Sequence, residues 1–269
     1  MQVPLLHQKL DRLRILLTEM GSVVVAYSGG IDSTFVLKVA HDQLHEKAVG
    51  ITAISPTFPS IELEAAERVA QEIGARHETV QTDQLAIDDF VRNDANRCFH
   101  CKTDLYQLLG KIRQSRAASY VVDGTNLDDL GDDRPGIIAA RQSGVRSPLV
   151  EAELSKADIR ALSKELGLSN WDKPAAACLS SRIPRGLVIT NEQLRRVEGA
   201  EAVLHREGFR HFRVRNHGEI ARIELAQHEF LRLMDSDRCV QISAKLKALG
   251  FKFVTVDLEG YRPGGVTLS

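Results

Sequence analysis

The segment from Val23 to Thr34 constrains the fold of this chain more than any other stretch. An apolar, β-branched run from Val23 to Ala26 enters a Ser-Gly-Gly turn, and an apolar helical pattern follows from Phe35. A chain that leaves a buried strand and starts a helix presents unpaired backbone N–H groups and the positive end of the helix dipole. The segment therefore predicts a strand–loop–helix unit with an anion-binding turn.

The residues of this turn favour contact with phosphate through a cation. Two glycines let the backbone approach a ligand without a Cβ in the way. Asp32 stands where a Walker loop carries its lysine, and an acid there would repel phosphate unless a cation lay between them. Asp32 is therefore expected to bind Mg²⁺. An ordinary strand–turn–helix without a ligand is the alternative interpretation.

This segment resembles the pyrophosphate loop of the N-type ATP pyrophosphatases, which cleave ATP to AMP and pyrophosphate while activating a substrate. The resemblance implies ATP and Mg²⁺ as cofactors. The loop residues expected to bind the nucleotide are Ala26, Ser28, Gly29, Gly30, Asp32, Ser33 and Thr34.

Strand and helix patterns alternate over the first two-thirds of the 269 residues. Strands are expected at Val23–Ser28, Ala48–Ser55, His77–Thr82 and Tyr120–Asp123. A helix is expected near Ile61–Ile73, with Ser60 as its N-cap and Gly74 closing it. This alternation predicts an α/β fold with a doubly wound parallel sheet, in which ligands bind at the carboxyl ends of the strands.

Three strand ends are expected to converge on the nucleotide. Besides the Ser-Gly-Gly turn, Ser55 follows the second strand and Gly124 follows the fourth. Arg134, in a charged loop beyond the fourth strand, is positioned to reach the nucleotide. Most of the acids in that loop, residues 128–133, are expected to be solvated.

A smaller α+β domain is expected at the C-terminal end. Ser155 begins one helix with a variant capping box, and Thr190 begins another that ends near Gly208. Strand patterns at His211–Arg215, Ile220–Leu225 and Phe251–Leu258 follow, with a helix to Gly250 before the last of them. The segment Asn170–Arg185 shows no periodicity. The expected domains are an ATP pyrophosphatase domain (1–170), an active-site loop and linker (171–189), and a small α+β substrate or oligomerisation domain (190–269).

Composition excludes some classes of function. The 35 basic and 36 acidic residues give a net charge of −1, so a nucleic-acid partner is not expected. No apolar run is long enough to span a bilayer and no signal peptide is evident, so a cytoplasmic protein without a membrane partner is expected. The four cysteines are then expected to be ligands or reactive thiols rather than disulfides.

Three cysteines form the second informative feature. Cys98 and Cys101 make a C-x-x-C pair, which brings two thiols to one point, and Cys178 lies in the segment without periodicity. Three thiolates suit a [4Fe–4S] cluster with one iron that has no protein ligand. A zinc site with His100 as a further ligand is the competing interpretation. Cys239 is expected to fill core or surface.

Arginines form the third feature. Arg213 and Arg215 alternate along a predicted strand, so both guanidinium groups are expected on one face. Arg182 and Arg185 follow Cys178, and planar guanidinium groups suit phosphate or carboxylate. A solvated polar strand face is the alternative interpretation, and Glu201 could be an ordinary surface acid.

Four groups of motifs together resemble one family, the LarE sulfur insertases: S-G-G-I-D-S-T, D-G-T-N-x-D-D with D-D-R-P-G, A-C-L-S-S-R-I-P-R-G, and R-V-R-N-H-G-E-I-A-R-I-E. The resemblance spans nearly the whole chain. It implies a small-molecule substrate, a pyridinium-dicarboxylate mononucleotide, whose carboxylates are adenylated by MgATP and converted to thiocarboxylates for the nickel-pincer nucleotide. It implies Cys178 as the sulfur-handling residue. The substrate or phosphate site would then be lined by Lys102, Ser181, Arg182, Glu201, Arg213 and Arg215.

Members of this family differ in how sulfur is supplied. Some use one cysteine that gives up its sulfur and becomes dehydroalanine. Cys98 and Cys101 make this chain similar to the three-cysteine branch, in which a [4Fe–4S] cluster carries the transferable sulfide. Sacrificial donation from Cys178 remains an alternative. A tRNA-thiolating enzyme, an amide synthetase and a nucleotide-binding regulator without turnover also remain alternatives. The protein is expected to form a homo-oligomer.

Overall fold

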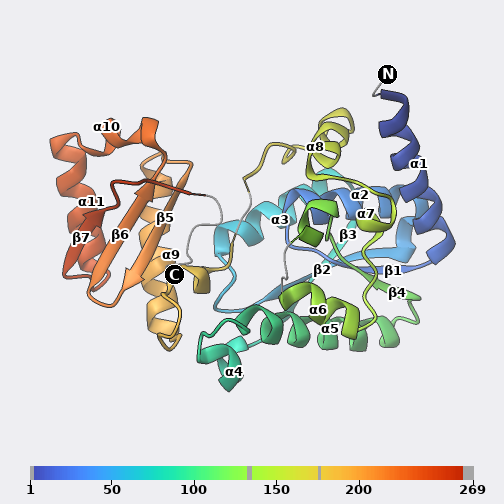
Figure 1. Cartoon of the computed structure of the whole chain (residues 1–269), viewed down its shortest axis with the longest axis horizontal. Coiled ribbons are helices and arrows are strands. Elements are labelled where there is room, and N and C mark those ends of the chain that lie inside the picture. The colour runs from blue at the N-terminus through green and yellow to red at the C-terminus, as the bar shows by residue number, and fades with distance from the viewer. Residues whose placement is uncertain (1–2, 132–134, 175–176, 263–269) are drawn as a thin grey trace. The chain divides into compact units, whose positions relative to one another are not determined.

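The computed structural model describes residues 3–131, 135–174 and 177–262 (Figure 1). Contacts divide the chain into two compact units. Unit 1 comprises Met1–Phe90 and Ala95–Ala176, and unit 2 comprises Val91–Asp94 and Ala177–Ser269. Unit 2 therefore includes a short segment that interrupts unit 1 in the sequence. The change of unit after residue 176 falls within the segment 171–189 that the sequence marks as a linker.

Unit 1 contains a parallel sheet of four strands with helices on both faces (Figure 1). The strands are β1 (Val23–Ala26), β2 (Ala48–Ile54), β3 (Arg76–Gln81) and β4 (Tyr120–Val122), in the order β3-β2-β1-β4. The helices are α1 (Val3–Met20), α2 (Ile31–Leu44), α3 (Ser60–Glu72), α4 (Asp88–Val91), which runs on into unit 2, α5 (Arg97–Ser115), α6 (Pro135–Gln142), α7 (Pro148–Glu151) and α8 (Lys156–Glu165). Short 3₁₀ turns lie at His45–Lys47, Gln84–Ala86 and Leu127–Gly131. The predicted parallel α/β fold is confirmed.

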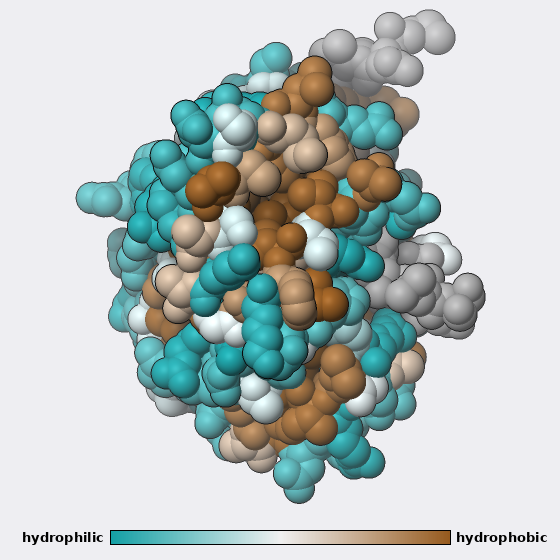
Figure 2. Space-filling view, turned by 90° about the vertical axis from the view of Figure 1, so that its left-hand side faces the viewer, coloured by the Kyte–Doolittle hydropathy of each residue, from teal (hydrophilic) through white to brown (hydrophobic). Residues whose placement is uncertain are grey.

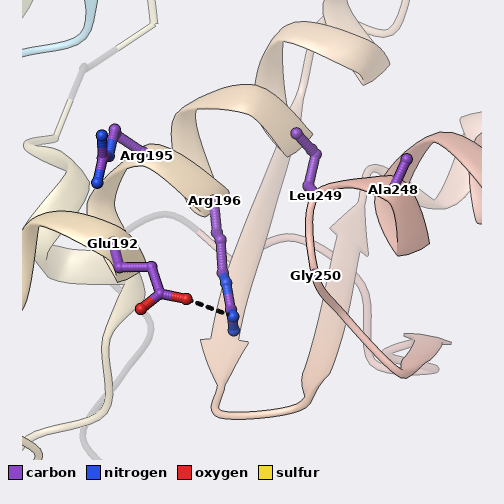
Figure 3. Close-up of a pocket in the computed structure, with 6 residues that line it drawn as sticks. All are labelled: Glu192, Arg195, Arg196, Ala248, Leu249 and Gly250. Atoms are coloured by element: carbon purple, nitrogen blue, oxygen red, sulfur yellow. Dashed lines mark hydrogen bonds and ion pairs between the residues drawn. The ribbon is translucent and has the colours of Figure 1, made fainter.

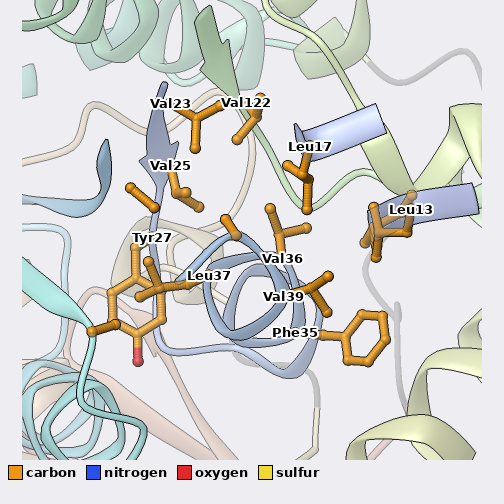
Figure 4. Packing of buried hydrophobic residues seen from close by; sticks show 14 of the residues in the cluster. Leu13, Leu17, Val23, Val25, Tyr27, Phe35, Val36, Leu37, Val39 and Val122 are labelled. Carbon is orange, nitrogen blue, oxygen red and sulfur yellow. The ribbon is translucent and has the colours of Figure 1, made fainter. Parts of the chain in front are cut away.

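The valines of β1 explain why the strand is central. Val23 and Val25 face α1 and α2, where they pack with residues such as Leu17 and Val36 (Figure 4). Val24 points to the opposite face and packs in the cluster that includes residues of α5 and α6. All three valines are fully buried, and each buried side chain of this size contributes about 1.5–3 kcal/mol. A strand buried on both faces is what the continuous apolar run predicts.

The strand order places a topological switch beside β1. The chain moves from β1 outward to β2 and β3, and then returns to the other side of β1 as β4. In open α/β sheets, ligands bind outside the carboxyl ends of the strands at such a point. The turn after β1 and the residues after β4 are therefore the place to look for a site.

Helix ends mostly follow the capping residues of the sequence. The capping boxes at Ser155 and Thr190 are both present, and Gly74 closes α3 with a left-handed backbone (φ 70°). The predicted N-cap of α3 is wrong. That role falls to Pro59, whose carbonyl accepts the first helical N–H groups, so Ser60 already lies inside the helix.

Unit 2 is a small α+β unit with a mixed sheet. Its strands are β5 (Phe212–His217), β6 (Ile220–Leu225) and β7 (Phe253–Val256), with β5 and β6 antiparallel and β6 and β7 parallel. Its helices are α9 (Asn191–Arg206), α10 (Phe230–Leu233) and α11 (Ser236–Ala248), with 3₁₀ turns at Leu179–Arg182 and Gln227–Glu229. The single helix expected before Gly250 is thus divided, because Asp235 caps a new helix start.

The two faces of the unit 2 sheet differ in character. Val214 and Ile223 belong to the apolar core with Leu204 of α9 and Leu246 of α11. The other face carries arginines and glutamates of β5 and β6, because side chains alternate along a strand. One face therefore stabilises the unit, and the other offers charged groups to a ligand.

Unit 2 also exposes large apolar side chains. Figure 2 faces the side of this unit that carries α10, α11 and β7, and it shows apolar surface among charged side chains. The most exposed are Leu231, Met234, Val240, Phe253 and Leu258. Exposed apolar surface of this kind is typical of contact with another molecule when it forms a patch. No helix in the described parts of the chain combines the length and apolar character needed to cross a bilayer.

Candidate active site

The loop after β1 forms an anion-binding turn at the N-terminus of α2. Gly30 is the N-cap with an extended backbone (φ −76°, ψ 158°), and no described side chain caps this helix. Gly29 adopts a left-handed backbone (φ 69°), and a Cβ there would lie 2.6 Å from the Cβ of Ala66. Only glycine fits this turn. The first N–H groups of α2 therefore face a position that suits a phosphate.

The hydroxyl groups of the loop divide into exposed and buried ones. Ser28 is exposed, and its hydroxyl lies 3.2 Å from the buried hydroxyl of Ser33, which donates to the Gly30 carbonyl at 3.1 Å. Thr34 is fully buried, and its hydroxyl accepts a hydrogen bond from Asn170 at 2.9 Å. Ser33 and Thr34 thus support the loop through these bonds, and their direct contact with a nucleotide stays a prediction.

Two residues of the segment without periodicity also stabilise the loop. The amide of Asn170 donates to the Gly29 carbonyl at 3.2 Å. The ammonium of Lys173 donates to the same carbonyl at 3.3 Å and pairs with Glu62 at 2.7 Å. Asn170, at the end of the predicted first domain, and Lys173, in the predicted linker, therefore stabilise the loop after β1, although no motif of the sequence marks either as a site residue.

Asp32 lies in the first turn of α2, where two other side chains reach its carboxylate. Nζ of Lys156 lies 2.5 Å from Oδ2, and the amide of Asn126 donates to Oδ1 at 3.4 Å. Both partners of the ion pair are partly exposed. A carboxylate at the N-terminus of a helix that suits phosphate is an oxygen ligand of the kind Mg²⁺ prefers. The residues present therefore fit a Mg²⁺ ion held by Asp32.

Lys156 is fixed as the first residue of α8. The Ser155 capping box sets the start of that helix, and the N–H of Lys156 donates to Oδ2 of Asp128 at 2.7 Å. Asp128 belongs to the loop expected to be mostly solvated, and here it positions a backbone group. The capping box predicts the start of this helix, and the same motif marks where Lys156 stands.

The end of β4 packs directly against the nucleotide loop. A Cβ on Gly124 would lie 2.7 Å from the backbone nitrogen of Ser33, so the two segments touch only because this residue is glycine. The preceding Asp123 is buried and accepts hydrogen bonds from Tyr106, Thr125 and Ser147 at 2.8–3.1 Å. Burial, followed by the proximity of Asp123, raises the pKa of Tyr106.

Two of the remaining predicted nucleotide ligands lie at the same edge of the sheet, and the third is not among the described residues. Ala26 is the last residue of β1, and Ser55 directly follows β2, where its hydroxyl lies 2.9 Å from that of Thr57. Arg134 lies outside the described residues. The predicted strand ends of β1, β2 and β4 thus carry the expected residues at the carboxyl edge.

Cys98 and Cys101 lie three residues apart in the first turns of α5, within unit 1. Neither cysteine forms a disulfide; Cys98 is exposed and Cys101 is half-buried. Lys102 follows them, and its ammonium lies 5.5 Å from the centre of the Tyr106 ring. The C-x-x-C spacing therefore places both cysteines at the N-terminal end of one helix.

Cys178 belongs to unit 2, where its peptide is held firmly. Its carbonyl accepts hydrogen bonds from the N–H and hydroxyl of Ser181, at 3.0 and 2.8 Å, and from Arg182 at 3.1 Å. The thiol is free and half-buried. Within the described ranges, no three His, Cys, Asp or Glu side chains are grouped so that they could hold one metal ion.

Arg182 connects this peptide to α9. The guanidinium is almost fully buried and makes a bidentate ion pair with Glu201 at 2.8 and 3.0 Å. Oε1 of Glu201 also accepts the N–H of Val214 on β5 at 3.1 Å. Glu201 is half-buried and links the Cys178 loop to the sheet through these bonds, which an ordinary solvated acid would not do.

Arg215 repeats this arrangement on the charged face of the sheet. It forms a bidentate pair with Glu224 at 2.8 and 3.0 Å and donates to the Ser181 carbonyl at 2.7 Å. Arg222 also reaches Glu224, at 2.9 Å. Neither Glu224 nor Arg222 is predicted as a site residue from the sequence, although their alternation within R-I-E is the signal that places them on this face.

Arg213 lies in a different environment on the same strand. Its guanidinium stacks over the ring of Tyr261 at 4.9 Å and donates to the Phe212 carbonyl at 2.8 Å. Burial and the nearby charge of Arg182 lower the pKa of Arg213. The same two kinds of cause, burial and neighbouring arginines, lower the pKa of His217 further along β5. This face therefore favours an anionic ligand.

Unit 2 also has an open cavity away from these residues. Figure 3 shows it where the start of α9 meets the end of α11, and its volume is about 380 Å³. The residues that line it are Glu192, Arg195, Arg196, Ala248, Leu249 and Gly250. None of the predicted site residues that the structure describes is among them.

A comparison with known proteins identifies the family. A pyridinium-3,5-bisthiocarboxylic acid mononucleotide synthase of Lactiplantibacillus plantarum is 39% identical over 252 residues, which cover 92% of this chain and 90% of that protein. The chain belongs to the LarE family. An uncharacterised protein of Synechocystis is 45% identical over 97% of both chains, and one of Methanocaldococcus jannaschii is 31% identical over 89% of this chain and 90% of its own.

Residues 14–103 also match the asparagine synthase family, and this range contains the loop after β1. Membership of the LarE family, together with this match, confirms the predicted enzyme class, an ATP-dependent sulfurtransferase with an ATP pyrophosphatase fold. The use of ATP agrees with the geometry at the N-terminus of α2.

Proposed function

We propose that this chain is a sulfur insertase acting on pyridinium-3,5-biscarboxylic acid mononucleotide, a step toward the nickel-pincer nucleotide. A carboxylate oxygen of the substrate attacks the α-phosphorus of ATP, and pyrophosphate leaves. A sulfur nucleophile then attacks the acyl carbon of the adenylate, AMP leaves, and a thiocarboxylate remains. The name of the Lactiplantibacillus relative supports this choice of substrate.

The observation that carries the proposal is the arrangement around the N-terminus of α2. No side chain in the described part of the protein caps this helix, and Asp32 and Lys156 form an ion pair beside it. In the proposed reaction the helix N–H groups bind the departing pyrophosphate, Asp32 holds Mg²⁺, and Lys156 moves from Asp32 to the phosphates. Donors fixed in advance where charge develops are the usual source of such catalysis.

Unit 2 supplies the substrate-binding groups of the proposal. Arg213 and Arg215 lie on the charged sheet face, and Ser181 and Arg182 hold the peptide of Cys178. We assign the arginines to the phosphate and carboxylates of the substrate, since planar guanidinium groups bind both in bidentate geometry. Lys102, next to the cysteine pair, is assigned to the same site.

The three cysteines are assigned to sulfur delivery. Cys98, Cys101 and Cys178 would hold a [4Fe–4S] cluster, because cysteines outside any disulfide, two of them at C-x-x-C spacing on a helix, are the donor set that such a cluster takes. When bound, the cluster would supply the sulfide. The substrate-binding residues would then hold the acyl adenylate beside Cys178, whose peptide Arg182 fixes. Sacrifice of the Cys178 sulfur is the alternative route.

The test is anaerobic purification followed by iron, sulfide and zinc analysis before and after turnover. The cluster route predicts about four irons per chain, lost in Cys101→Ala. Iron-free protein that loses one H₂S from its mass after turnover would instead establish sacrifice of Cys178. Zinc without iron would support the zinc interpretation. A homo-oligomer and a cytoplasmic location stay predictions from the sequence.

A further inference from the structure

Asn93 is a buried residue with an unusual backbone. It has no exposed surface and adopts the left-handed conformation (φ 58°), which asparagine tolerates better than most residues. It lies in Val91–Asp94, the segment that belongs to unit 2 although unit 1 residues flank it in the sequence. The chain therefore enters unit 2 for a few residues and then leaves it again shortly before Cys98.

The side chain of Asn93 holds a loop that has no regular structure. Its amide nitrogen donates to the Pro184 carbonyl at 2.8 Å and to the Leu187 carbonyl at 2.9 Å, with the Ile183 carbonyl at 3.5 Å. An amide NH₂ has two hydrogens, so the two short bonds use both. These carbonyls have no partner in a strand or helix, and the buried Asn93 amide supplies their donors.

The backbone of this segment adds to the same contact. The N–H of Gly186 donates to the Asn93 carbonyl at 3.1 Å, and the N–H of Ile189 donates to the Val91 carbonyl at 3.0 Å. Together with the side-chain bonds, they form what we call the Asn93 clasp, the hydrogen bonds between residues 91–93 and residues 183–189. The clasp lies wholly within unit 2.

The two peptides in the clasp lead to the cysteines in opposite directions. Cys98 follows Asn93 by five residues, and Cys178 precedes Ile183 by five. An extended chain spans at most about 3.6 Å per residue, so each of these cysteines is within about 18 Å of the clasp along the chain. The clasp thus replaces a much longer covalent path between the two thiol-bearing segments.

We propose that Asn93 is a positioning residue of the sulfur-delivering site. Its amide holds the peptide that leads to Cys98 and Cys101 against the peptide that follows Cys178, and so raises the effective concentration of the three thiols toward one another. This inference rests on the proposed function, in which the three cysteines act together. Asparagine suits the position because it combines a left-handed backbone with two donors.

The experiment measures that effective concentration in the full-length, metal-free chain. The substitutions Cys98→Ser and Cys239→Ser leave two thiols, Cys101 and Cys178. Equilibration with reduced and oxidised glutathione then gives the fraction of protein with a Cys101–Cys178 disulfide, and from it the effective concentration of the two thiols. Asn93→Gly keeps the left-handed backbone and removes the donors. It should lower the effective concentration about tenfold, as expected when a short restraint is replaced by a long one. Ala117→Gly, at another left-handed residue (φ 52°), should change nothing.

The outcomes separate this inference from the proposed function. If the Cys98→Ser, Cys239→Ser protein that keeps Asn93 forms no Cys101–Cys178 disulfide, the three-cysteine site of the proposed function is wrong. If it forms the disulfide and Asn93→Gly forms it equally well, the clasp is overturned as a positioning device. MgATP affinity should be unchanged in Asn93→Gly, since the nucleotide loop lies in unit 1. If that variant does not fold, Asn93→Ser, with one hydroxyl donor, should give an intermediate lowering, and an unchanged value would overturn the inference.

Discussion

Replacement of Lys156 by glutamine tests the role assigned to the Asp32–Lys156 pair. The change removes the ammonium but keeps a polar side chain as the first residue of α8. Nζ lies 2.5 Å from the Asp32 carboxylate, and the two side chains are 30% and 24% exposed. In the proposed reaction this charge moves to the pyrophosphate as it departs, so its loss should affect the rate far more than the fold.

The magnitudes of the two effects should differ clearly. A partly exposed ion pair contributes at most about 1 kcal/mol to the free energy of unfolding. One preorganised donor at the point where charge develops contributes about 2.7–4 kcal/mol, or about 10²- to 10³-fold in kcat. Lys156→Gln should therefore be stable but slow. Because the ammonium competes with Mg²⁺ for Asp32, the Mg²⁺ concentration for half-maximal rate should not rise.

The assay is release of pyrophosphate from MgATP in the presence of the dicarboxylate substrate, with chemical denaturation in parallel. Lys156→Arg is the matched control, since it keeps the charge and should retain much of the rate. A Lys156→Gln enzyme with the wild-type kcat would refute the assigned role. So would a variant that loses rate only because it unfolds.

Three further changes probe separate parts of the structure. Gly124→Ala places a methyl group 2.7 Å from the Ser33 nitrogen, so MgATP affinity measured by calorimetry should fall about tenfold or more, and unchanged affinity would refute the contact. Glu224→Ala leaves the buried Arg215 without its carboxylate and should lower the free energy of unfolding by about 3–5 kcal/mol in denaturant titrations; a negligible loss would contradict this. Burial holds the pKa of His77 below its usual 6.5, so below that pH the unfolded chain binds a proton that the native chain does not. The free energy of unfolding should then fall as the pH decreases, and His77→Gln should reduce this slope, whereas an equal slope in both proteins would contradict a half-buried, neutral imidazole.

The parts of the fold that the sequence predicts correctly depend on local patterns. The valine run, the turn glycines and the apolar helix that follows them are neighbours in the chain, so β1, the loop and α2 can be recognised together. The capping boxes at Ser155 and Thr190 are equally local. Ser60 fails as an N-cap because the neighbouring Pro59 starts the helix one residue earlier.

The parts that the sequence misses depend on long-range contacts. Lys156 meets Asp32 from 124 residues away, and Asn126 reaches the same carboxylate from 94 residues away. No periodicity or spacing relates such residues. The partner of Arg215 is similar, since Glu224 lies opposite Arg213 in the register of β5 and β6 rather than near it in any motif. Individual charged residues can be singled out from a sequence, but their pairing requires the fold.

The central claim is that activation of a carboxylate by ATP is coupled to delivery of sulfur in this chain. The most direct measurement incubates the anaerobically purified protein with MgATP and pyridinium-3,5-biscarboxylic acid mononucleotide, and follows all products by mass spectrometry. The account predicts a product in which sulfur replaces a carboxylate oxygen, with AMP and pyrophosphate formed in equal amounts. AMP and pyrophosphate without any sulfur-containing product from sulfur-loaded protein, or no ATP cleavage at all, would contradict it.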